Sequence, residues 1–128
     1  SLLPQPEQVE PRLLDDVLAQ AERASQRTLD RTRVTLEVLQ HLPRLLVADA
    51  RDQLGVALSE TLCAAADNLR GTQSQLRLEL CDEGLRVRLR LDAAIPERVA
   101  VGVKSRLSPL GGAIEVGTGE TRLWLPRA

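Results

Sequence analysis

A chain of 128 residues with a formal net charge of −1 is long enough for one domain built around one hydrophobic core. Positive and negative side chains are spread along the sequence, which excludes the strongly basic surface of a nucleic-acid-binding protein. No apolar run reaches the length of a membrane span, and no signal peptide is visible, so we expect no membrane contact. Because Trp124 is the only aromatic residue, the core must be built from Leu, Val, Ile and Ala.

The two cysteines, Cys63 and Cys81, suggest buried thiols in a reducing compartment and therefore a cytoplasmic protein, with a disulfide as the alternative. Neither has a His or a further Cys at ligand spacing, so no metal site is predicted. The chain begins with Ser and has no Met, and we expect it to be a piece of a longer protein.

The N-terminal part of the chain predicts a linker followed by an amphipathic helix. Residues 1–10 are proline-containing and are predicted to be the linker, so that the domain comprises residues 11–128. From Pro11 to about Arg27, apolar residues recur at helical spacing. We expect this stripe to pack on its own domain or to pair with another copy or with helices of the parent protein. Our prediction is the second, with the main intermolecular contact, most simply a symmetric homodimer, through Leu13, Leu14, Val17 and Leu18.

The middle of the chain predicts a strand and then a long central helix. Residues 33–39 alternate apolar and polar side chains, which is typical of a strand. Asp49 is a natural N-cap for the helix that follows, and Gly71 suits its left-handed C-terminal position. The run of small residues 63–66 leaves room for something to lie close against the helix backbone. An apolar face at three- and four-residue steps is formed by Leu54, Leu58, Leu62, Ala65 and Leu69.

The C-terminal half predicts two hairpins separated by a third helix. The expected elements are strands 75–81 and 85–91 around the turn 82–84, a helix over 96–110, and strands 113–116 and 121–125. Hairpins interspersed with helices favour an α/β fold: a two-layer sandwich with a mixed, mostly antiparallel sheet and about three helices on one face.

Several arginines are predicted to share one face of this sheet. Arg86, Arg88 and Arg90 alternate with leucine and valine, and Arg77 on the neighbouring strand should point the same way. Glu79 can pair with one of them but cannot neutralise all four. The face is therefore either a docking surface for an acidic partner or simply a solvated outer face.

Three fragments carry a resemblance to a known family. Leu42-Pro43 precedes a helix containing Leu58-Ser59-Glu60-Thr61-Leu62, and residues 101–107 precede Leu110-Gly111-Gly112 and the closing strands. In this order they resemble the nucleotide-binding domain, of the Bergerat or GHKL type, of bacterial sensor histidine kinases. The resemblance covers nearly the whole chain from about Leu29, and it implies a role in two-component signal transduction.

The chain departs from the family pattern where Mg²⁺-ATP would bind. In the family an Asn one turn after the helix Glu ligates the metal, but the position four residues after Glu60 is Ala64. Asn68 stands where a phosphate-facing residue is expected. Asp92 can match the adenine-contacting Asp only if the alignment slides by one residue, and no glycine follows it. Of the glycines at the start of the third helix only Gly102 remains, and the lid over the phosphates is absent.

The resemblance therefore implies a degenerate, catalytically silent domain without cofactor or metal, which acts as a regulatory or protein-interaction module for helical or sensor regions of its parent protein. Glu60, Asn68, Asp92 and Gly102 would be vestiges of the site. The site itself should be closed, with Leu91 and Ile95 packed against the central or third helix and no ATP-sized cavity left.

Two alternatives remain open. One is a divergent ATP-binding histidine kinase that uses Glu60 and Asp92 with a shortened lid. The other is a phosphotransfer protein, which needs a histidine on an upstream helix. His41, the only histidine, is expected in a strand-to-helix connection instead.

Overall fold

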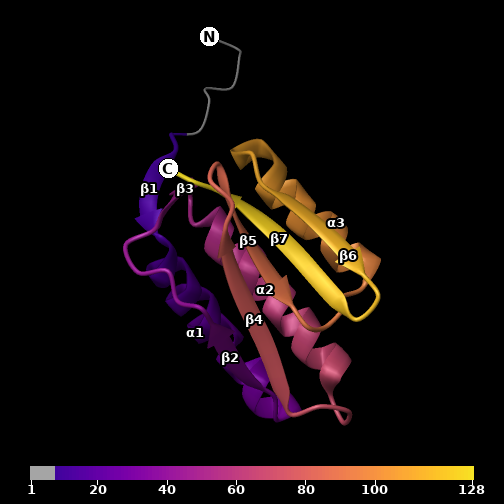
Figure 1. The fold of residues 1–128 in the computed structure, drawn as a ribbon. Coiled ribbons are helices and arrows are strands. Elements are labelled where there is room, and N and C mark those ends of the chain that lie inside the picture. The colour runs from indigo at the N-terminus through magenta and orange to yellow at the C-terminus, as the bar shows by residue number, and fades with distance from the viewer. Residues whose placement is uncertain (1–7) are drawn as a thin grey trace.

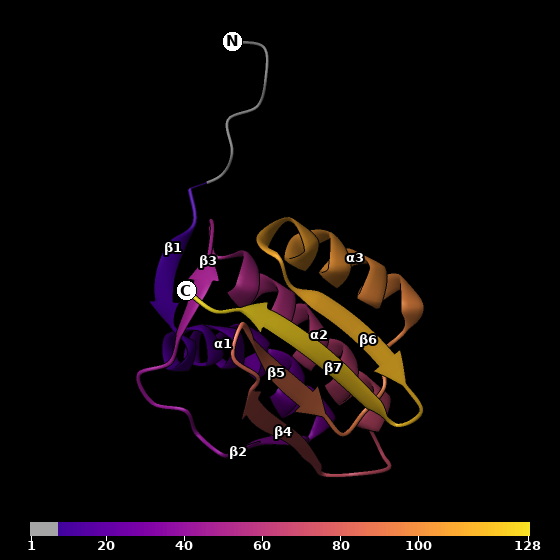
Figure 2. The same cartoon turned by 45° about the horizontal axis from the view of Figure 1, so that its top comes forward.

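The computed structural model describes residues 8–128, which form two layers (Figure 1). Three α-helices cover one face of a five-stranded sheet, and a second, two-stranded sheet lies near the C-terminus (Figure 2). None of the helices in residues 8–128 is long and apolar enough to cross a membrane. In chain order the elements are β1 (Glu10–Leu13), α1 (Leu14–Thr32), β2 (Thr35–Leu39), β3 (Leu46–Asp49), α2 (Gln53–Leu69), β4 (Gln75–Asp82), β5 (Arg86–Leu91), α3 (Glu97–Leu107), the 3₁₀ turn η1 (Ser108–Leu110), β6 (Ala113–Gly117) and β7 (Glu120–Pro126).

The main sheet has the strand order β2-β4-β5-β7-β6. Only β2 and β4 are parallel, while the β4–β5, β5–β7 and β6–β7 pairs are antiparallel. Both predicted hairpin turns are present, and Gly84 and Gly119 adopt the positive φ angles of 92° and 70° that tight turns favour in glycine. The predicted α/β sandwich with a mixed, mostly antiparallel sheet is confirmed.

The core lies between the sheet and α2 and consists of aliphatic side chains. Alternate residues of β4 and β5 point toward the helices, as their period-two pattern predicts. Leu85 was expected to point inward as well, but it precedes β5 in the hairpin turn and is 89% exposed. The fully buried leucines of α2, β4, β5 and β7 are Leu54, Leu58, Leu62, Leu76, Leu78, Leu80, Leu89, Leu91, Leu123 and Leu125.

The N-terminal part differs from the sequence prediction. Glu10–Leu13 form β1, an edge strand that pairs antiparallel with β3, so Leu13 belongs to a strand and not to the helix. Pro11 is tolerated there because an edge strand does not need every backbone N–H. Of the predicted linker, residues 1–7 lie outside the described residues. Strand β3 was not predicted at all.

The apolar stripe of α1 packs on its own domain. Leu14 and Val17 are completely buried and Leu18 is 8% exposed, all in the cluster that α1 shares with α2. These three side chains therefore cannot supply an intermolecular contact in this conformation, and the expectation of a homodimer through them is corrected. Leu13 alone of the predicted contact residues is exposed, at 38%.

Replacing Leu14 by Ala should lower the free energy of unfolding by about 2–5 kcal/mol, because a fully buried leucine leaves a cavity. The neighbouring Leu13→Ala change is the matched control and should cost about 1 kcal/mol or less. Urea unfolding followed by circular dichroism measures both. Equal losses for the two variants would contradict the assignment of α1 to the core.

Candidate functional site

An open cleft lies between α2 and the start of α3. It has a volume of about 710 Å³, within the range typical of ligand sites. The prediction that this site is closed was wrong: Leu91 and Ile95 are buried and do not line the cleft, which stays open. The lining residues are Glu60, Cys63, Ala64, Asp67 and Asn68 from α2, Pro96 before α3, and Arg98, Val99 and Gly102 from α3.

The short side chains of α2 explain why the cleft exists. Cys63 and Ala64 face it, whereas Ala65 and Ala66 face the core and are fully buried. On the opposite wall, a Cβ on Gly102 would lie 3.8 Å from Oε2 of Glu60, an ordinary contact distance. The α2 face of Cys63 and Ala64, on which a closely packed neighbour was expected, therefore lines the open cleft.

Glu60 is bound to a cation from the last turn of α3. Arg106 Nε donates to Glu60 Oε1 at 2.6 Å, and Arg106 Nη1 donates to Gln53 Oε1 at 3.2 Å. We call these two contacts the Arg106 bridge. It joins α3 to two turns of α2 and neutralises the carboxylate that the family resemblance places at the catalytic position.

The structure brings three of the four candidate residues to the cleft. Glu60, Asn68 and Gly102 line it, and Asn68 Nδ2 donates to the backbone oxygen of Ala94 at 2.9 Å. Asp92 is not among the lining residues. Its carboxylate accepts the backbone N–H of Arg77 at 2.7 Å and so stabilises the turn after β5.

Two lining residues were missed by the sequence analysis. Asp67 lies seven residues after Glu60, which is two helical turns and therefore the same face of α2, so helical spacing could have identified it. It forms an ion pair with Arg31 of α1 at 2.8 Å. Arg98 in the first turn of α3 has no comparable signal in the sequence, because only the packing of α3 against α2 brings it to the cleft.

The cleft offers no metal ligand at residue 64. Mg²⁺ requires a set of oxygen ligands in octahedral geometry, and Ala64 offers none. Within residues 8–128 no group of three or more His, Cys, Asp or Glu residues could hold a metal ion. Both carboxylates that line the cleft are already paired with arginines.

The architecture is the GHKL fold of histidine kinase ATP-binding domains. The mycobacterial sensor histidine kinase MprB is similar, with a TM-score of 0.69 and 18% identity over 94% of this chain and 98% of that chain. The catalytic domain of histidine kinase ThkA is also similar, with a TM-score of 0.73 and 11% identity over 94% of this chain and 96% of that chain. The ATP-binding domain of PrrB from Mycobacterium tuberculosis has a TM-score of 0.66 and 16% identity over 94% of this chain and 98% of that chain. Identities this low show a shared fold. No family model and no curated protein matches the chain in sequence.

The arginine-rich outer face of the sheet is neutralised within the chain. Four acidic residues from neighbouring strands and turns pair with three of the arginines that alternate on β4 and β5. The fourth, Arg86, lies over the ring of Trp124, with its Cζ 5.8 Å from the ring centroid. This geometry favours the solvated outer face over a docking surface for an acidic partner. The ion pairs are Arg77–Glu37, Arg88–Glu83, Arg90–Glu79 and Arg90–Glu120.

One of these pairs makes stability depend on pH. The hydrogen bond from Arg90, assisted by its charge, holds the pKa of the Glu120 carboxyl below its ordinary value. A depressed pKa in the folded state contributes stability above the pKa of the unfolded chain, and this contribution disappears as the pH falls through the folded-state value. Glu120→Gln should therefore lower the urea midpoint at pH 7, and the deficit should shrink toward pH 3.

The matched control for this prediction is Glu97→Gln, which changes an exposed carboxylate in the first turn of α3. Its effect on the urea midpoint at pH 7 should be smaller than that of Glu120→Gln. A deficit of Glu120→Gln that stays constant between pH 7 and pH 3 would show that the pair with Arg90 does not stabilise the charged carboxylate.

Proposed function

We propose that this domain is a catalytically silent relative of the histidine kinase ATP-binding domain, and that it works as a regulatory or protein-interaction module in two-component signal transduction. The observation that carries the proposal is which side chains form the α2 wall of the cleft and what they bind. Ala64 stands one turn after Glu60, where a metal ligand would be needed, and Glu60 itself is bound to Arg106.

The electrostatics of the cleft support this proposal. Phosphoryl transfer from a nucleotide depends on positioning and on positive charge around the phosphates. Arg98 is the one cation among the nine lining residues, and Glu60 and Asp67 place two carboxylates beside it. Both carboxylates are paired with arginines, so a triphosphate without a metal ion would find one cation in the lining, Arg98, which is little positive charge for the substrate of a kinase.

The role that follows is conformational. A domain without phosphoryl transfer can still transmit a change through its contacts with the parent protein's helical or sensor regions, in the cytoplasm where such signalling takes place. Its exposed surfaces, and not the buried stripe of α1, would make these contacts.

A second function has one observation in its favour. The open cleft of about 710 Å³ has room for a nucleotide, which fits a divergent ATP-binding kinase domain. This function would require a metal ligand other than residue 64, which is an alanine.

Calorimetric titration with Mg²⁺-ATP and Mg²⁺-ADP tests the proposal. We expect no saturable heat at sub-millimolar nucleotide and no shift of the melting temperature. A ligand at roughly 100 times its Kd would stabilise the fold by about 2.7 kcal/mol, which a thermal melt detects readily.

A Mg²⁺-dependent thermal shift in the wild type would overturn the proposal and favour the kinase. Gly102→Phe, which fills the cleft between Glu60 and α3, is the accompanying variant. If nucleotide binding is found and the variant abolishes it, the nucleotide occupies this cleft.

A further inference from the structure

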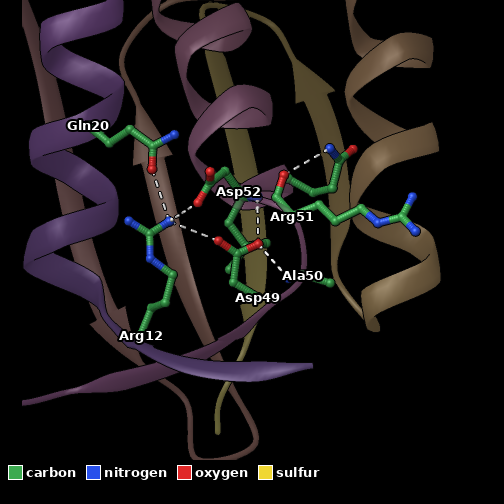
Figure 3. A network of polar contacts seen from close by, with 8 residues as sticks. Arg12, Gln20, Asp49, Ala50, Arg51 and Asp52 are labelled. Atoms are coloured by element: carbon green, nitrogen blue, oxygen red, sulfur yellow. Dashed lines mark hydrogen bonds and ion pairs between the residues drawn. The ribbon is translucent and has the colours of Figure 1, made fainter. Parts of the chain in front are cut away.

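A polar network around Arg12 connects the N-terminal strand to two helices (Figure 3). Nη1 of Arg12 donates to Oε1 of Gln20 on α1 at 2.9 Å, to Oδ2 of Asp49 at the end of β3 at 2.9 Å, and to Oδ1 of Asp52 at 3.3 Å. We call these four residues the Arg12 network. It adds side-chain contacts to the backbone pairing of β1 with β3, in which Glu10 lies opposite Asp49.

Asp49 connects this network to the start of α2. Its side chain is 1% exposed, and its Oδ1 accepts the backbone N–H groups of Ala50 at 2.8 Å and Leu54 at 3.1 Å. The residue was predicted to be the N-cap, but the cap position is Asp52, and Asp49 satisfies a first-turn amide from the end of β3 instead. A buried carboxylate with these partners depends on the Arg12 charge.

The turn between Asp49 and α2 has an unfavourable backbone. Arg51 and Asp52 both adopt the left-handed conformation, with φ angles of 53° and 57°. Two consecutive residues with a Cβ in this region persist only where the surrounding contacts enforce them. The Asp49 carboxylate is such a contact, and in Figure 3 it lies directly beneath the turn. Arg12 in turn binds the other oxygen of this carboxylate, Oδ2, at 2.9 Å.

The turn leads directly into the Arg106 bridge. Gln53, the first residue of α2, donates from Nε2 to the backbone oxygen of Arg51 at 3.4 Å and accepts from Arg106 at 3.2 Å. Arg106 in turn binds Glu60 on the cleft wall. A continuous set of contacts thus runs from β1 through the turn to the two helices that border the cleft.

We propose that strand β1 regulates the width of the cleft. With β1 in place, the Arg12 network enforces the turn at residues 51–52, and Gln53 and Glu60 bind Arg106 so that α3 stays close to α2. Displacement of β1 relaxes the turn, weakens the Arg106 bridge and lets α3 move away. By thermodynamic reciprocity, a molecule that fills the cleft changes how tightly β1 binds to the domain.

This inference rests on the proposed function, because it supplies the conformational change that a silent module would transmit. The two can fail separately. Nucleotide titration tests the proposed function, whereas the coupling is measured below without nucleotide.

Cys63 on the cleft wall provides the measurement. In a Cys81→Ser background the single thiol is modified by Ellman's reagent at a rate that follows its accessibility between α2 and α3. Arg12→Met should raise this rate roughly threefold or more, a size expected for coupling between neighbouring sites. Arg106→Met should raise it as well. The fold-increase of the Cys63 rate in the double variant should be smaller than the product of the two single-variant increases, because both substitutions act on one set of contacts.

Two controls separate coupling from general loosening. Arg88→Met breaks an ion pair on the outer face of the sheet and should leave the Cys63 rate at the parental value. Leu14→Ala lowers global stability and gives the rate change caused by unfolding alone. The proposal is overturned if Cys63 of Arg12→Met reacts at the parental rate. It is also overturned if Cys63 of Arg12→Met reacts no faster than Cys63 of Leu14→Ala at matched stability. If Arg12→Met does not fold, Arg12→Lys is used with the same criteria, since it retains the charge but not the three contacts.

Discussion

The burial of the leucine face of α2 against β4 and β5 is the interaction on which the remaining structure depends. Each fully buried leucine contributes roughly 1.5–3 kcal/mol relative to an exposed one, and no aromatic side chain is available to replace them. Because α2 is also covered by α1 on one side and α3 on the other, its position determines where both helices lie. The cleft lies beside the part of α2 that contains Glu60, Cys63, Ala64, Asp67 and Asn68.

Much of this fold could be predicted from the sequence, for a physical reason. Leucine and valine alternate with arginine and glutamate in β4 and β5, and a period of two assigns each side chain to one face of the sheet. The small sheet could not be predicted in the same way. Strands β1 and β3 have four residues each, and their pairing joins Arg12 to a carboxylate 37 positions away in the chain.

The candidate site was predictable in its chemistry but not in its shape. The missing metal ligand at Ala64 follows from counting along one helix, and Glu60, Asn68 and Gly102 do line the cleft. The open state does not follow from such counting. It depends on the spacing between α2 and α3, which contacts between distant residues such as Arg106 and Glu60 determine. The position of Asp92 likewise depends on the backbone N–H of Arg77, which no motif specifies.

The ion pairs on the outer face of the sheet have a consequence for molecular recognition. Charges that are already in contact at 3–4 Å lie within the screening length of about 8 Å at physiological ionic strength, whereas attraction to an approaching molecule is lost beyond that length. An acidic molecule that binds Arg77, Arg88 or Arg90 on this face must replace an existing ion pair. Although the sheet carries many arginines, it presents a nearly neutral surface, with little electrostatic steering to attract polyanions from solution.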